Sequence, residues 1–168
     1  DYDAPAAGDW SANLTDGLSH ANVTWNYKEW YGIKNGLNVN GTVADIDFDF
    51  RTLYDISSVR LHILDGGVNG YAGIGIAKGF EVYTSTDGKA YTKAGDIEVK
   101  VDENATLHIY WTELVLDKTI EARYVRIRLY LPDENDFIML NEVEVYGKLS
   151  DNAYDPEPVI RDNLALNK

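Results

Sequence analysis

The sequence predicts an all-β domain, an antiparallel β-sandwich of the jelly-roll type. Short runs that alternate between apolar and polar residues recur along the chain, and glycine, proline, asparagine or aspartate separates them. About eight such runs are present, and no window of about 11 residues has the roughly 3.6-residue apolar period of an amphipathic helix. Many short strands with turn residues between them are typical of sandwiches and jelly rolls.

The first half of the chain contains the clearest strand. In the run 43–50, apolar residues alternate with three aspartates, which indicates a strand with one buried and one solvated face. A second alternating run, 59–64, leads into a glycine-rich loop. The run 80–85 is expected to be a further strand, which Asp87-Gly88 turns back.

The second half continues in the same way. Short strands are expected at 97–101, 106–111 and 113–116. The longer run 123–131 alternates cleanly, and Arg126 and Arg128 are expected to pair with the aspartates of another strand.

The last strand, 140–146, ends at a glycine. Its alternation assigns Val143 and Val145 to the core and leaves Glu142 and Glu144 on the opposite face. Composition then divides the chain into a lead-in, one domain and a polar linker. The expected boundaries are 1–9, 10–148 and 149–168.

Charge and composition exclude several classes of function. The net charge is −13, so nucleic acid and anionic membranes are not expected as partners. The chain has no cysteine, which excludes disulfides, thiolate metal sites and a cysteine nucleophile. No apolar run approaches the roughly 18 residues of a membrane span, and no membrane insertion is expected.

Several motifs occur together in one order. They are an Asp-Gly turn followed by Thr24-Trp25, a glycine-rich loop, and the segments 85–91, 122–127 and 141–147. This order resembles the discoidin-like superfamily, which contains the coagulation-factor type C domains and the galactose-binding-like carbohydrate-binding modules. The resemblance covers about residues 9–148 and implies a jelly roll of two antiparallel sheets.

The resemblance also implies a structural Ca²⁺ ion near the joined chain ends. The eukaryotic branch usually closes those ends with a disulfide, so the absence of cysteine favours the Ca²⁺-binding, bacterial branch. Asp16 and Glu142 match the carboxylate positions of the family. Further oxygen ligands are expected from the backbone of Asn13, Leu18 and Ser19 and from the hydroxyl of Thr24. The alternative is that Asp16 is a turn residue and Glu142 an exposed strand residue.

Aromatic rings and planar polar groups of the loops are the candidates for sugar binding. Family members bind ligands on loops at one end of the sandwich, which correspond here to 26–36, 65–76 and 132–137. The candidates are Asn26, Trp30, Tyr31, Asp65, Asn69, Tyr71, Asp133 and Asn135. A packing role for the aromatic residues is an equal alternative. Leu64-Asp65 stands where the galactose-binding subgroup has an arginine, which leaves a galactose preference open.

Together these features predict a non-catalytic carbohydrate-binding module of a secreted or cell-surface, multimodular protein. We expect it to be a monomer within a larger chain that carries a glycoside hydrolase or another glycan-active domain. No nucleophile elbow, phosphate loop or zinc motif is present. The segment 163–168 looks like the opening of a second similar module. The alternatives are an adhesion module that binds a protein and a spacer without a ligand.

Overall fold

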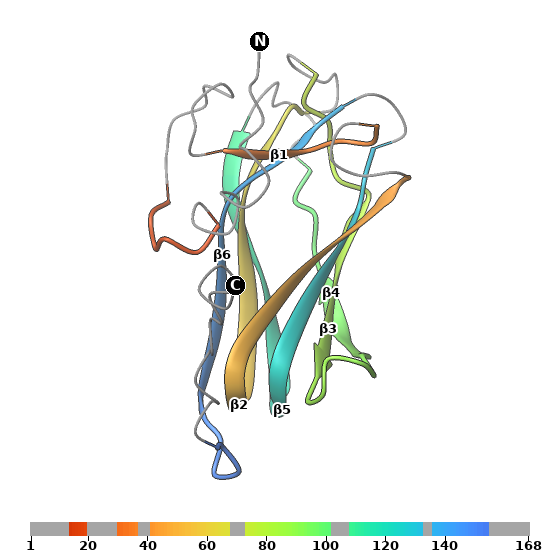
Figure 1. The fold of residues 1–168 in the computed structure, drawn as a ribbon. Coiled ribbons are helices and arrows are strands. Elements are labelled where there is room, and N and C mark those ends of the chain that lie inside the picture. The colour runs from red at the N-terminus through yellow and green to blue at the C-terminus, as the bar shows by residue number, and fades with distance from the viewer. Residues whose placement is uncertain are drawn as a thin grey trace, which may run out of the picture.

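The chain folds as a single antiparallel sheet bent into a sandwich. The computed structural model describes residues 14–19, 30–36, 41–67, 73–101, 108–132 and 136–154. These ranges hold six strands, namely β1 (Tyr31–Ile33), β2 (Val43–Asp65), β3 (Gly79–Ser85), β4 (Thr92–Ile97), β5 (His108–Tyr130) and β6 (Ile138–Leu149). Their order is β1-β6-β2-β5-β3-β4, and every neighbouring pair is antiparallel (Figure 1). The predicted all-β fold is confirmed.

Two further findings bear on the predicted organisation. Within the described residues, no helix has the length and hydrophobicity needed to cross a membrane. The expected lead-in, 1–9, and the segment 163–168 lie outside the described residues.

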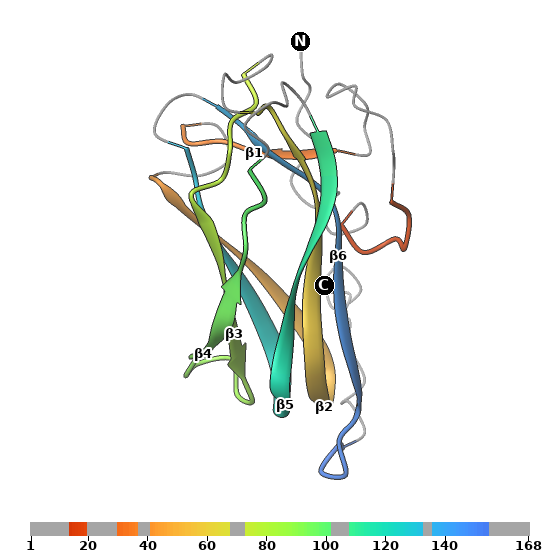
Figure 2. The ribbon, with the colours of Figure 1, turned by 180° about the vertical axis from the view of Figure 1, so that it is seen from behind.

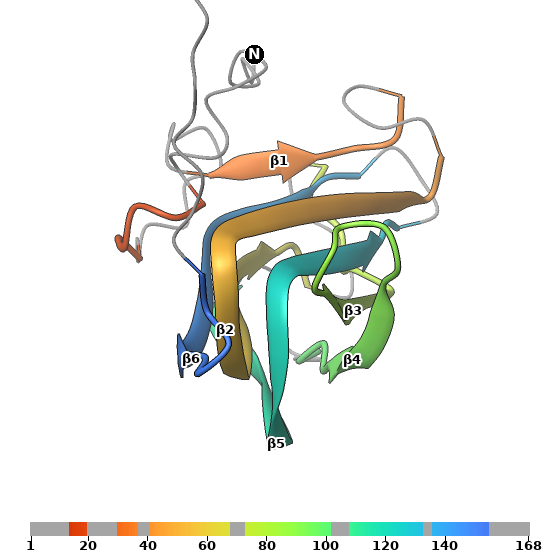
Figure 3. The same cartoon turned by 60° about the horizontal axis from the view of Figure 1, so that its bottom comes forward.

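The strand count differs from the sequence prediction because two strands turn a corner. β2 and β5 have 23 residues each, and Figure 3 shows the bend in both. The register of β2 against β5 shifts between Asp49 and Tyr54 and between Ile56 and Ser58, and Arg51 has a φ of 69°. Bulges of this kind bend a strand and reset its alternation. The predicted runs 43–50 and 59–64 therefore lie in the two arms of β2, and the described parts of the runs 106–111, 113–116 and 123–131 lie in β5. The predicted strand at 97–101 is wrong, because β4 spans Thr92–Ile97 and ends there.

The pairing assigns these arms to different layers. The first layer contains β4, β3, the C-terminal arm of β5 (124–130) and the N-terminal arm of β2 (43–49). The second layer contains β1, β6, the C-terminal arm of β2 (54–65) and the N-terminal arm of β5 (108–115). In Figures 1 and 2, β6 and the β3–β4 pair accordingly lie on opposite sides of β2 and β5.

Both layers contribute to one hydrophobic core. Apolar residues from each arm of β2 meet residues of β3, β5 and β6 there. The core includes Ala44, Ile46, Val59, Leu61, Ile63, Phe80, Val82, Val125, Ile127, Leu129, Leu140 and Val143. The inward positions predicted from the alternation of the run 123–131 are all buried.

The outer face of the first layer carries the expected ion pairs. Arg128 binds Asp45 through two hydrogen bonds of 2.8 Å, and Arg126 binds Asp47 through bonds of 2.6 and 2.8 Å. Each arginine also lies over a tyrosine ring. Exposed pairs of this kind contribute up to about 1 kcal/mol each, so they order the face more than they stabilise the fold.

Candidate functional site

The described part of the first loop is attached to the last strand. The N–H of Val143 in β6 donates a 2.8 Å hydrogen bond to the carbonyl of Leu14, and the Leu14 side chain is fully buried in the core. These contacts hold residues 14–19 against β6. They bring together the two segments that the sequence predicted to share a metal ion.

The turn at Asp16-Gly17 has the local structure that its sequence favours. Asp16 Oδ1 accepts a 2.8 Å hydrogen bond from the N–H of Leu18, as in an Asx turn. Gly17 has a φ of 76°, which a residue with a side chain rarely adopts. The Asp16 carboxylate is thereby presented beside β6.

Glu142 is buried under this turn, with 2% of its surface exposed. Burial raises its pKa to about 7, although a hydrogen bond from the backbone of Gly17 opposes the shift. The nearby carboxylates of Asp16 and Glu144 raise it further. Among the described residues, Glu142 Oε2 has no hydrogen-bond partner. The alternative that Glu142 is an exposed strand residue is wrong, because the loop covers it.

This arrangement fits a hard cation. Two neighbouring carboxylates, one of which raises the pKa of the other and the second of which has a buried oxygen without a hydrogen-bond partner among the described residues, are stabilised when a cation binds between them. No group of three or more His, Cys, Asp or Glu side chains that could hold a metal occurs in the described ranges. Backbone carbonyls or water would thus complete the coordination. Leu18 and Ser19 lie in the exposed turn, whereas Asn13 and Thr24 fall outside the described residues.

The described parts of the loops predicted to bind ligand lie at the end of the molecule that β1 crosses (Figure 1). Residues 31–33 of β1 pair with 138–140 of β6. The glycine-rich loop is joined to the same region, because the N–H of Gly75 donates to the carbonyl of Phe137 at 3.0 Å. Lys34 Nζ lies 4.9 Å from the centre of the Phe137 ring. Described parts of all three loops are therefore neighbours.

Trp30 has a structural role, which corrects its assignment to sugar binding. It is fully buried in a second cluster with Leu64, Ile74 and Met139. Its ring stacks on His62, with 5.6 Å between the ring centres. A sugar cannot reach this ring without unpacking the cluster.

The prediction that Asp65 binds a ligand is also wrong. Asp65 is buried, with 1% of its surface exposed. Its Oδ1 accepts a 2.9 Å hydrogen bond from the N–H of Gly67 and lies 2.9 Å from His108 Nδ1. Burial, followed by the charge and hydrogen bond of Asp65, raises the pKa of Tyr110. Asp65 therefore ties the end of β2 to the start of β5 and is not presented to a ligand.

Tyr31 is half-buried at the start of β1 and packs partly against the main core. Among the aromatic residues predicted to bind sugar, Tyr31 is the one in the described part of the chain that is partly exposed. The other candidates lie outside the described residues, namely Asn26, Asn69, Tyr71, Asp133 and Asn135.

Two features of this region were not predicted. His62 lies between Trp30 and Trp111, and its Nδ1 is 3.0 Å from Asn141 Oδ1. The contact of Lys34 with Phe137 joins two loops about a hundred residues apart in sequence. Spacing along the chain gives no signal for either contact, because each depends on how the strands pair.

Comparisons with known proteins agree with this architecture. A search of curated protein sequences finds no match. The solved structures that resemble the chain include a CBM32 module of AlyQ in complex with 4,5-unsaturated mannuronic acid. It has 18% identity and a TM-score of 0.52, and the match covers 86% of this chain and 96% of that one.

Two bacterial modules are similar at the same level. CBM32-3 from a family 31 glycoside hydrolase of Clostridium perfringens has 19% identity and a TM-score of 0.51, with 78% and 85% of the two chains covered. Chitosan-binding module 1 from a chitosanase/glucanase of Paenibacillus sp. IK-5 has 16% identity and a TM-score of 0.50, with 84% and 87% covered. At these identities the likeness shows a shared fold. The profile of the F5/8 type C domain matches residues 5–143, and the chain belongs to this discoidin-like family.

Proposed function

We propose that the chain is a non-catalytic carbohydrate-binding module of a secreted, multimodular, glycan-active protein. The observation that supports it is that the described parts of three loops, with Tyr31, Lys34 and Phe137, lie together at one end of a discoidin-like sandwich. The similar structures are named as modules that bind chitosan or hold an uronic acid, or as parts of glycoside hydrolases.

The ligand site would lie on these loops. The exposed part of the half-buried Tyr31 ring would contact the C–H groups of a sugar. The backbone bonds between the loops fix their relative positions before a ligand binds, which lowers the entropic cost of binding.

A Ca²⁺ ion would stabilise the fold by holding residues 14–19 against β6. Asp16 and Glu142 would be its carboxylate ligands. The role is structural, because an ion at this place would offset the cost of burying Glu142.

A glycan array probed with the chain in the presence of Ca²⁺ tests this function. We expect binding to one or a few related glycans, and Tyr31→Ala should weaken it about threefold to tenfold. Tyr154→Ala is the matched control, because Tyr154 is exposed outside the loops. Binding by Tyr31→Ala equal to that of the parent chain would argue against the loop site. Silence across the whole array would favour a protein-binding adhesion module or a spacer.

A further inference from the structure

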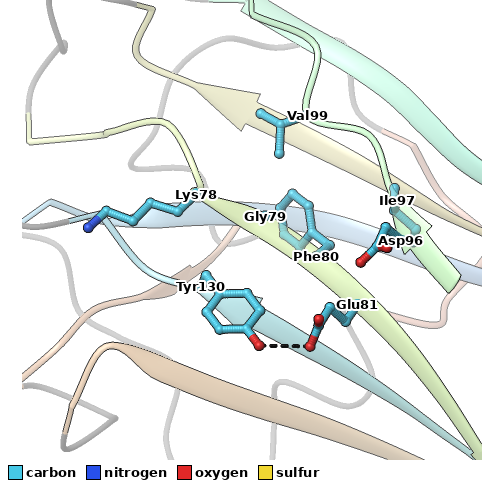
Figure 4. A pocket seen from close by; sticks show the side chains of 8 residues that line it. All are labelled: Lys78, Gly79, Phe80, Glu81, Asp96, Ile97, Val99 and Tyr130. Carbon is cyan, nitrogen blue, oxygen red and sulfur yellow. Dashed lines mark hydrogen bonds between the residues drawn. The ribbon is translucent and has the colours of Figure 1, made fainter. Parts of the chain in front are cut away.

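A hollow lies where the start of β3 meets the ends of β4 and β5, apart from the residues assigned to ligand binding. It has a volume of about 390 Å³ and is lined by Lys78, Gly79, Phe80, Glu81, Asp96, Ile97, Val99 and Tyr130 (Figure 4). This volume is near the lower end of the range of small-molecule pockets, about 300–1,000 Å³. The hollow can therefore hold a small ligand.

Gly79 keeps the hollow open. It is the register partner of Tyr130, and a Cβ at Gly79 would lie 3.8 Å from Tyr130 Cδ2, an ordinary van der Waals distance. Its φ lies outside the left-handed region, so the backbone does not require glycine here. Gly79 is the first residue of β3, and without a side chain it leaves the Tyr130 ring open to contact on that side.

Glu81 provides a fixed, charged acceptor at the edge of the hollow. Its Oε1 accepts a 2.6 Å hydrogen bond from Lys93, and its Oε2 accepts bonds of 2.7 Å from Tyr130 and 2.8 Å from Tyr83. The bond from Lys93, followed by those from the tyrosines, lowers the pKa of Glu81 to about 2. Each carboxylate oxygen can accept about two hydrogen bonds, so Oε1 can still accept one from a ligand.

The charges around the hollow balance. Lys93 also contacts Asp96 at 2.7 Å, and it therefore bridges the two carboxylates. The Lys78 ammonium extends away from both of them, as Figure 4 shows. Two carboxylates and two lysines give no net attraction for a charged ligand, although the chain as a whole carries −13. Acceptors beside the Tyr130 ring instead suit a neutral molecule with hydroxyl groups and an apolar face.

We propose that this hollow is a second binding site, which takes one neutral sugar ring. The sugar would stack on the Tyr130 ring over Gly79, and its hydroxyls would donate hydrogen bonds to Glu81 and Asp96. This site goes beyond the proposed function, because it uses none of the residues assigned to the loop site. A chain with both sites could hold a polysaccharide at two points.

Amide chemical shifts of the ¹⁵N-labelled chain test the proposal. The probes are the methyl glycosides of glucose, galactose, mannose and N-acetylglucosamine, each titrated to about 20 mM. We expect saturable shifts at Gly79, Glu81 and Val99 with at least one sugar, and a Kd on the order of a few millimolar. Shifts at the loop end report on the other site, so the two are separated within one spectrum.

Two substitutions test whether the sugar binds in the hollow. Gly79→Val fills the hollow in a strand-compatible backbone and should weaken the binding about tenfold or more. Thr92→Val is the matched control, because it places the same side chain at an exposed position of β4 outside the hollow, and it should bind like the parent chain.

Two results would overturn the proposal. One is the absence of saturable shifts at the hollow with every probe. The other is a folded Gly79→Val variant that binds as tightly as the parent chain. If Gly79→Val does not fold, Asp96→Ala decides, because the Asp96 side chain is 68% exposed. It should weaken binding about threefold, and unchanged affinity would equally overturn the proposal.

Discussion

Replacing Glu142 with glutamine should stabilise the chain when Ca²⁺ is removed. The variant keeps the shape of the side chain and removes a charge that is buried without a partner for Oε2. A rise in pKa from the ordinary 4.5 to about 7 means that ionised Glu142 destabilises the folded state by about 3 kcal/mol above pH 7. For a domain of this size, that corresponds to about 6–12 °C in melting temperature.

The sign of the pH dependence follows from the direction of this shift. Because the folded-state pKa is raised, the protonated carboxyl is favoured on folding. The resulting stability is fully present below about pH 4.5 and is lost as the pH rises through about 7. The gain of Glu142→Gln over the parent chain should therefore be under about 1 kcal/mol at about pH 5 and near its full value at about pH 8.

Thermal melting in a chelator at both pH values measures this difference. Glu144→Gln is the matched control, because Glu144 lies on the same strand but is paired with Arg60, which lowers its pKa. That control should gain nothing and lose less than about 1 kcal/mol. With Ca²⁺ added, the parent chain should gain stability and Glu142→Gln should not. A Glu142→Gln variant that melts at or below the parent chain at about pH 8 in chelator would refute the reasoning.

Three further predictions concern packing and the metal. Trp30→Ala should destabilise the fold by about 3–5 kcal/mol in denaturant unfolding, since it empties the buried cluster, and a loss below about 1 kcal/mol would contradict its assignment to that cluster. Gly147→Ala should cost about 1–3 kcal/mol in the same assay, because its Cβ would lie 2.6 Å from the carbonyl oxygen of Asp55; an unchanged midpoint would show that the strands can separate without cost. Ca²⁺ affinity, measured by calorimetry, should fall as the pH drops below about 7 and Glu142 takes up a proton; an affinity independent of pH between about 5 and 8 would exclude Glu142 as a ligand.

The fold class could be read from the sequence because alternation reports directly on which side chains face the core. Asp45 and Asp47 were assigned to a polar face, as were Arg126 and Arg128, and they pair there. The number of strands could not be read in this way. The bend near Arg51 resets the alternation, so one long strand looks like two short ones.

The candidate sites depended more on tertiary contacts. The pairing of Asp16 with Glu142 followed from family resemblance, but the burial of Glu142 requires the loop that covers it. Trp30 could be read as a loop aromatic or as a core residue, and only its stacking on His62 decides. The hollow could not be predicted from the sequence, because it depends on the strand pairing that places Gly79, which has no side chain, beside Tyr130.

Calorimetric titration of the chain with the glycan that an array selects tests the central claim most directly. The account predicts saturable binding with a Kd between about 1 mM and 1 μM in the presence of Ca²⁺, and weaker binding by Tyr31→Ala. A sample that melts cooperatively but gives no binding heat with any glycan across a broad panel would contradict a carbohydrate-binding role.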